Sequence, residues 1–390
     1  MPVTKRAAAR VPSPRAEKSA KDAWFAELHQ VSRAYLRQTR ALSYRELCAN
    51  QDAPWASIAF GAAGIAAAHL RSGRGVEIAQ RWLTEAARGS RTRGAFWNPN
   101  FENESAGPSL YYGADGIQLL RLLARRGDDR ALRAFLARCR RCRGGPSELL
   151  QGVAGYLTAL VVLYRISREP RVLEVADELA HDLLERAGGR RGWARAPKVG
   201  FAHGRAGTIH ALLGWSLVGG RELPAELFGH LARLADDVEA MGAPSSSGGP
   251  WSKTLERSWC NGAAGLVLLW TRAYEHTSDA KYLRRARDAA RSLLTYTTGA
   301  PGDLCCGLGG RAYALLAMDR IAPGRGWFDR ALAMASGAAA AMLEGCGPWP
   351  NGLFKGYPGL VCLTRDLSEA PTDRIGFPLV DGPYSATRAS

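Results

Sequence analysis

The chain has 390 residues, of which 46% are hydrophobic and 23% charged, a balance typical of a folded protein rather than a disordered one. Its formal net charge is +16, and only seven of its 52 basic residues are lysine. We find no zinc-finger spacing, no RNA-binding aromatic motif and no apolar run of about 18 residues, so we expect neither nucleic-acid binding nor a membrane span.

Residues 1–22 carry an excess of basic side chains with prolines and small residues, and they lack the central apolar stretch of a secretory signal. They predict a flexible basic tail, followed by a single domain over residues 23–390. Without a secretory signal we expect a reducing, cytoplasmic location, where the eight cysteines stay free or bind metal. The positive charge favours an acidic partner, although an arginine-rich composition explains it equally well.

From residue 60 onward, the motif G-x-x-G followed by an apolar run occurs seven times. One such motif is a weak signal, but seven in near-regular array indicate a repeat architecture. Between the motifs lie segments with apolar residues at helical spacing and charges on the opposite face, such as 128–141, 170–187, 224–241 and 281–294. The first glycines of the seven copies are Gly61, Gly113, Gly152, Gly204, Gly262, Gly307 and Gly356.

Each repeat therefore predicts a polar outer helix and an apolar inner helix that begins at the motif, and strand signals are nearly absent. Seven such pairs can stack as an open solenoid or close into a ring. A solenoid needs polar end caps, whereas the last copy is as apolar as the middle ones, so closure is favoured. We predict an all-α fold, an α/α toroid of seven inner and seven outer helices, with the glycine loops gathered at one end of its central cavity.

Equivalent positions in the repeats bring chemically reactive side chains together. The residue directly before the first glycine is His203 in the fourth repeat and Cys306 in the sixth, and Cys260 and Cys305 lie one position further back. Three thiols on two neighbouring loops suit a catalytic zinc ion, which takes three protein ligands and keeps one position open. The alternative for each cysteine is a small buried core residue.

Other reactive residues are less clearly placed by the repeat. His203 precedes a helix and can act as an acid or base near neutral pH, or it can cap or pack. The C-R-R-C segment at 139–142 lies in a charged outer helix and off the repeat register, so we interpret it as structural. For Cys48, Cys346 and Cys362 the default interpretation is core filling or exposure.

These motifs resemble those of the lanthionine synthetase C-like (LanC-like) family over roughly residues 50–380. The matching stretches are GFAHGRAGTIHAL, SWCNGAAGL, LCCGLGGRAYALL and the C-terminal GLFKGYPGLVCLTRDLSEAPTDRIGFPL, while SELLQGVAGYLTAL is similar to eukaryotic members. The resemblance implies an α/α toroid with one zinc ion, Zn²⁺, held by Cys260, Cys305 and Cys306, and with His203 as the residue that handles protons. Most members have Cys-His-Gly where this chain has Cys-Cys-Gly, so the chain resembles the three-cysteine variant.

The activity that the resemblance implies is that of the bacterial members, which are lanthipeptide cyclases. In them a zinc-bound peptide cysteine thiolate adds across the double bond of dehydroalanine or dehydrobutyrine and forms a thioether ring. The implied partners are a dehydrated precursor peptide, whose leader a basic surface could hold if it is acidic, and a separate dehydratase. We expect a cyclase component alone, because no dehydratase region fits in the N-terminal residues before the resemblance begins.

Two other functions stay open. Like eukaryotic members, the protein could add glutathione to dehydrated residues of damaged proteins, or it could be a zinc-binding scaffold without turnover. A carbohydrate-active toroid is disfavoured, because no pair of acidic residues occupies the cavity-facing offset.

Two further candidate residues lie where the chain departs from the cyclase pattern. Glu148 stands where cyclases carry an aspartate, so it predicts either a proton acceptor or an ordinary cap for the next helix. Arg257 lies one position from the place of a cyclase arginine, which is Glu256 here, and is a candidate to stabilise a developing enolate. The third thiolate, Cys306, would give the zinc site a single net negative charge, from which we expect a faster and less selective cyclase.

Overall fold

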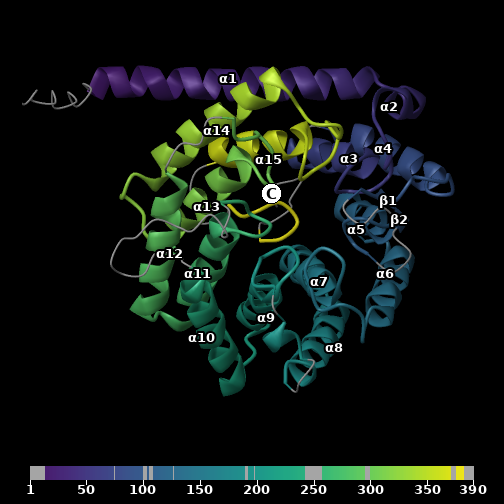
Figure 1. The fold of residues 1–390 in the computed structure, drawn as a ribbon. Helices are drawn as coiled ribbons and strands as arrows, with labels where there is room; N and C mark the ends of the chain where they lie inside the picture. The colour runs from purple at the N-terminus through teal and green to yellow at the C-terminus, as the bar shows by residue number, and fades with distance from the viewer. Residues whose placement is uncertain are drawn as a thin grey trace, which may run out of the picture.

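Two concentric layers of helices form a closed ring in the computed structural model (Figure 1). The structure describes residues 14–73, 75–99, 103–104, 109–125, 127–188, 192–196, 198–241, 257–294, 299–369 and 375–381. As predicted, an inner helix begins at every G-x-x-G motif. The inner helices are α3 (Ala62–Arg71), α5 (Asp115–Ala124), α7 (Val153–Ser167), α9 (Arg205–Gly219), α11 (Ala263–Thr277), α13 (Leu308–Ile321) and α15 (Tyr357–Ser368).

The outer layer follows the same order, and each outer helix from α4 to α14 packs against the inner helix that precedes it. The contact between α15 and α3 closes the ring, which makes the fold the predicted α/α toroid. The outer helices are α1 (Pro14–Ala41), α4 (Val76–Gly89), α6 (Asp129–Arg141), α8 (Pro170–Glu185), α10 (Ala225–Ala240), α12 (Ala280–Leu293) and α14 (Trp327–Glu344).

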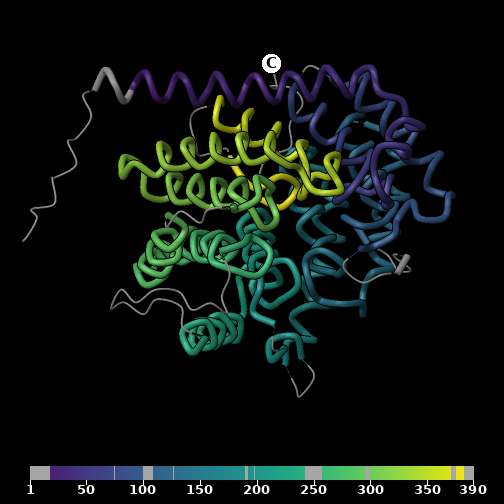
Figure 2. Tube along the Cα trace, turned by 45° about the horizontal axis from the view of Figure 1, so that its top comes forward, coloured from purple at the N-terminus to yellow at the C-terminus, as the bar shows by residue number. Residues whose placement is uncertain are grey.

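The seventh outer helix comes from the N-terminus. Helix α1 packs against α14 and α15, and Figures 1 and 2 both show it lying across one side of the ring. Part of the expected tail over residues 1–22 is helical, because α1 begins at Pro14, and the Lys21 ammonium lies 2.7 Å from the Asp329 carboxylate on α14. Alanine, lysine, glutamate and arginine dominate this stretch and are strong helix formers. Residues 1–13 lie outside the described residues, and the division into tail and domain stays a prediction.

Short elements complete the described part of the chain. They are the helix α2 (Tyr44–Asn50), the 3-10 turn η1 (Trp193–Arg195) and two paired antiparallel strands, β1 (Trp97–Asn98) and β2 (Asn103–Glu104). A capping box between Ser43 and Glu46 starts α2. Within these described residues, no helix has the length and apolarity required to cross a bilayer.

The glycine motif lets a loop cap its own inner helix, as in the third and sixth repeats. The N–H of Val153 donates to the carbonyl oxygen of Pro146 at 2.8 Å, and the N–H of Leu308 donates to that of Pro301 at the same distance. A Cβ atom on Gly152 would collide with the Pro146 carbonyl, so only glycine permits this approach. The loop carbonyls thus satisfy amide groups that the N-terminus of a helix leaves unpaired.

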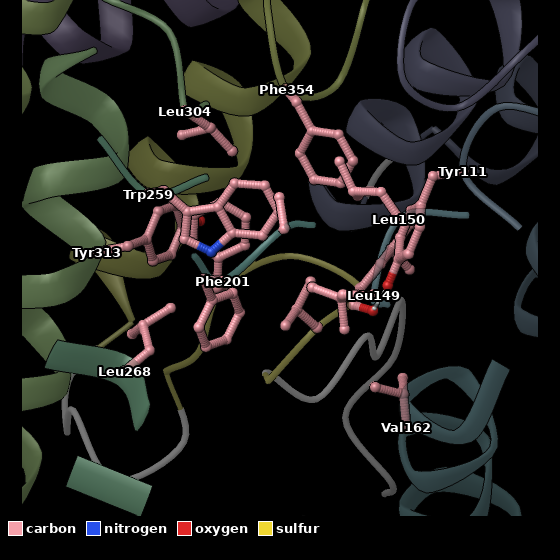
Figure 3. Close-up of a cluster of buried hydrophobic side chains, with 14 of the residues drawn as sticks. Tyr111, Leu149, Leu150, Val162, Phe201, Trp259, Leu268, Leu304, Tyr313 and Phe354 are labelled. Atoms are coloured by element: carbon pink, nitrogen blue, oxygen red, sulfur yellow. Dashed lines mark hydrogen bonds between the residues drawn. The ribbon is translucent and has the colours of Figure 1, made fainter. Parts of the chain in front are cut away.

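Apolar side chains fill the centre of the ring below the motif loops. The residue three positions before each first glycine is at most 1% exposed, and Figure 3 shows Leu149, Phe201, Trp259 and Leu304 of this set near Phe354. These side chains hold the loops that carry the candidate site. The full set is Ile58, Leu110, Leu149, Phe201, Trp259, Leu304 and Leu353.

The segment 375–381 enters this interior after α15. The Phe377 ring stacks on the Trp259 ring with centroids 4.5 Å apart and planes 7° apart. The Asp381 carboxylate is 4% exposed and forms an ion pair with Arg272 of α11. The segment therefore packs against the face of Trp259, the residue directly before the candidate ligand Cys260.

Candidate metal centre

A chain of backbone hydrogen bonds links the motif loops of neighbouring repeats. The N–H of Leu150 donates to the carbonyl of Ala202 at 3.2 Å, and that of Ala202 donates to Cys260 at 2.8 Å. The N–H of Cys260 donates to Cys305 at 3.3 Å, and that of Cys305 donates to Phe354 at 2.9 Å. Four consecutive links of this kind hold the third to seventh loops edge to edge, so residues at the same offset face one another.

The three cysteines that the sequence predicts as ligands form one cluster. The Cys306 sulfur lies 3.6 Å from the Cys305 sulfur and 3.9 Å from the Cys260 sulfur, and all three lie within 4.8 Å of one another. Zinc–sulfur bonds of about 2.3 Å at tetrahedral angles would place sulfur ligands about 3.8 Å apart. The donor set and its spacing therefore fit a zinc ion with one position left open.

No disulfide competes with metal binding in this cluster. Sulfur atoms in a disulfide are about 2.05 Å apart, far closer than any pair here. Among the described residues, these three cysteines form the only group of metal-binding side chains within ligand distance. Cys139 and Cys142 are buried at the end of α6, in agreement with a structural role.

A partly buried ammonium group lies against the cluster. Lys355 Nζ donates to the Cys306 sulfur at 2.9 Å, and the Cys306 N–H donates to the Asp303 carboxylate at 2.7 Å. Hydrogen bonds from the thiols of Cys260 and Cys305, and then the Lys355 charge, hold the pKa of the Cys306 thiol far below its usual range. Burial opposes the Lys355 charge, but the neighbouring cysteine cluster and the Asp303 carboxylate outweigh it and raise the Lys355 pKa. The Lys355 contact thus favours the thiolate form of Cys306, which is the form that binds metal.

His203 and Glu148 form the second predicted element of the site. The His203 Nδ1 atom lies 2.6 Å from one Glu148 carboxylate oxygen, while the other oxygen accepts the N–H of Gln151 at 2.9 Å. Glu148 therefore both caps the loop before α7 and orients the imidazole. Each side chain keeps less than a fifth of its surface exposed, 18% for His203 and 17% for Glu148. This carboxylate–imidazole pair is an arrangement suited to moving a proton.

Within the described residues, no hydrogen bond or ion pair joins Arg257 to the pair of His203 and Glu148. Arg257 precedes Cys260 by three positions and lies near enough to the buried Arg311 on α13 that its charge, after burial, lowers the Arg311 pKa. No hydrogen bond joins Arg257 to the cysteine cluster or to His203 within the described part of the chain, and Glu256 lies outside it. Its role in stabilising an enolate stays a prediction.

Lys355 and Asp303 were not among the residues that the sequence predicts for the site. Lys355 occupies the offset of His203 and Cys306, directly before the first glycine of the seventh repeat. The position of Lys355 within the repeat could therefore have placed it among the candidate site residues. Asp303 lies three residues before Cys306, the same spacing that separates the capping Glu148 from Gln151.

The chain is similar to known proteins in sequence and in fold. The family model described as "Lanthionine synthetase C-like protein" matches residues 55–379. The LanC-like protein GCL1 of Arabidopsis thaliana is 28% identical over 270 residues, which cover 60% of this chain and 59% of the relative. The chain thus matches less than two thirds of that relative's length.

Two solved structures match most of this chain. Nisin cyclase superposes with a TM-score of 0.64 over 89% of this chain and 94% of its own, at 15% identity, which supports the toroid fold alone. A GH76 α-mannanase of Bacteroides thetaiotaomicron matches 90% of this chain and 97% of its own at 12% identity, but its TM-score of 0.40 is too low to support an argument.

Proposed function

The chain belongs to the LanC-like family, and from that premise we propose that it is a zinc-dependent cyclase that forms thioether rings in a dehydrated precursor peptide. The observation that carries the proposal is the cluster of Cys260, Cys305 and Cys306, with sulfur–sulfur distances of 3.6 and 3.9 Å. Bound zinc would lower the pKa of a peptide thiol and supply a thiolate nucleophile at neutral pH.

The protein's own residues supply ligands, position and proton transfer. When a thiolate sulfur bonds to the β-carbon of dehydroalanine or dehydrobutyrine, the π electrons move to the α-carbon side and form an enolate. The enolate carbon then takes a proton. We assign that proton to His203, which Glu148 holds at 2.6 Å in a fixed orientation. Arg257 is proposed to stabilise the enolate charge.

Glutathione addition is the second candidate function, and the similarity to the LanC-like protein of Arabidopsis thaliana, which is not named a cyclase, keeps it in view. The two reactions need the same thiolate chemistry and differ only in where the thiol comes from. A bound glutathione would deliver the sulfur in one case, and the peptide's own cysteine in the other.

One experiment tests the metal and the reaction together. We expect the purified protein to contain one zinc per chain and the Cys306→Ser variant to contain less, measured by elemental analysis. The wild type should also consume the free thiol of a dehydrated, cysteine-containing peptide. Ring closure leaves the mass unchanged, so alkylation of the remaining thiols followed by mass spectrometry counts the rings.

The outcomes separate the candidate functions. A mass increase of one glutathione per dehydrated residue, seen only when glutathione is added, supports the second function. A protein that holds zinc but forms no thioether under either condition supports the scaffold. A wild type without stoichiometric zinc contradicts all three.

A further inference from the structure

The three cysteines of the cluster differ in their access to solvent. Cys260 and Cys305 are 8% and 9% exposed, whereas Cys306 is only partly buried. A protein that binds dehydroalanine handles an electrophile that reacts with any accessible thiolate. The outermost thiolate, Cys306, is therefore the ligand most exposed to alkylation by the substrate.

Lys355 contacts the Cys306 thiolate. Its ammonium nitrogen lies 2.9 Å from the Cys306 sulfur, the distance of a charge-assisted hydrogen bond. The backbone fixes this approach, because the carbonyl of Phe354 accepts the Cys305 N–H at 2.9 Å and sets Lys355 opposite Cys306. No second lysine or arginine donates to the three sulfurs within the described residues.

We propose that Lys355 protects Cys306 from alkylation by the electrophilic substrate, an inference that rests on the proposed function. A sulfur lone pair engaged with an ammonium group is a weaker nucleophile than a free one. A substrate thiolate without such a hydrogen bond would then be the more reactive sulfur. The ammonium charge also offsets the net negative charge of three thiolates. The third cysteine alone is therefore not sufficient reason to expect a faster and less selective reaction.

The damage that Lys355 would prevent is a defined reaction. The Cys306 sulfur would bond to the β-carbon of dehydroalanine, the π electrons would move to the α-carbon, and water would supply the proton there. The resulting thioether is neutral and a poor metal ligand. Each alkylation would therefore inactivate one site.

The test exposes the zinc-loaded full-length protein to N-acetyl-dehydroalanine amide, an electrophile without a thiol. We expect Lys355→Met to raise the alkylation rate of Cys306 about tenfold, the effect of losing one hydrogen bond to a charged group. Mass spectrometry of the peptide that contains Cys306 measures the rate, and a chromogenic chelator measures zinc release. Lys281→Met is the matched control, because it removes one ammonium group from the exposed side of α12.

A spectroscopic readout separates protection from a general loosening of the site. In the cobalt-substituted protein, Lys355→Met should shift the sulfur-to-cobalt charge-transfer band to lower energy, because the freed thiolate is more electron-rich. Lys355→Arg, which keeps a donor and a charge, should restore both the band and the slow alkylation. Circular dichroism confirms that each variant is folded.

Two outcomes distinguish this inference from the proposed function. If Cys306 reacts equally fast in wild type, Lys355→Met and Lys281→Met, the inference is overturned while the cyclase proposal stands. If Lys355 slows the alkylation but the wild type forms no thioether with any peptide, the inference stands and the cyclase proposal falls.

Discussion

Glu148 uses its two carboxylate oxygens for different purposes. One accepts the Gln151 N–H at 2.9 Å and stabilises the loop, and the other holds His203 at 2.6 Å. Glu148→Gln keeps an oxygen for the loop but loses the charge beside the imidazole. Since acid–base catalysis contributes about 10²-fold or more, we expect Glu148→Gln to slow thioether formation by about that factor. Initial rates of free-thiol loss measure this effect.

The matched variant Glu148→Ala separates the two purposes of this residue. It removes the loop hydrogen bond as well, so its free energy of unfolding should fall by about 1 kcal/mol below that of Glu148→Gln. Chemical denaturation measures the difference. A Glu148→Gln rate equal to that of the wild type would show that Glu148 serves the loop alone.

Helix α1 joins the ring through a buried histidine on α3. His69 Nε2 lies 2.9 Å from the Thr39 hydroxyl of α1, and burial, followed by the charges of Arg40 and Arg81, lowers the His69 pKa from 6.5 to about 4. The folded state thus favours neutral His69, while the unfolded chain protonates it near pH 6.5. Stability from this residue is complete above pH 6.5 and is lost as the pH falls toward 4.

This linkage predicts a measurable acid sensitivity at the junction of α1 and α3. Between pH 7 and pH 5, His69 should account for about 2 kcal/mol of lost unfolding free energy, and His69→Gln should remove that part of the loss. Denaturant titrations at the two pH values measure it. His181→Gln, at an exposed position on α8, is the control. Equal pH dependence in all three proteins would refute the assignment to His69.

At the scale of the whole molecule, the sequence predicts the elements that repeat and the contacts between residues close together in the chain. Each inner helix begins where a G-x-x-G motif lies, because the glycine and the loop carbonyl that caps the helix are neighbours in the chain. The grouping of Cys260, Cys305 and Cys306 follows from the same register. The three cysteines could therefore be recognised from the sequence as one candidate metal-binding group.

Contacts between residues far apart in the chain leave no such pattern in the sequence. No local pattern indicates that α1 supplies the seventh outer helix, because its partners α14 and α15 lie some 300 residues away in sequence. The ion pair of Asp381 with Arg272 likewise depends on how the C-terminal segment enters the interior of the ring. These pairings are visible only in the folded ring.

Closure of the ring predicts how the molecule unfolds. In an open solenoid, each repeat contacts only its neighbours, so the ends can unfold while the middle persists. Here α15 packs on α3, α1 packs on α14, and residues 375–381 contact inner helices across the interior, so no repeat is terminal. We expect a single cooperative transition in which tryptophan fluorescence and helical circular dichroism change together.

Weakening the closure should make the transition depend on the probe. Arg71 on α3 forms ion pairs with Asp366 and Glu369 at the end of α15, across the seam of the ring, and is 8% exposed. Arg71→Met leaves the buried Asp366 charge without its main partner, which costs about 3 kcal/mol or more. Arg133→Met on α6 is the control, because its exposed ion pair with Asp129 lies within one helix. If Arg71→Met still unfolds with coincident probes and an unchanged midpoint, closure at this seam does not govern the cooperativity of the ring.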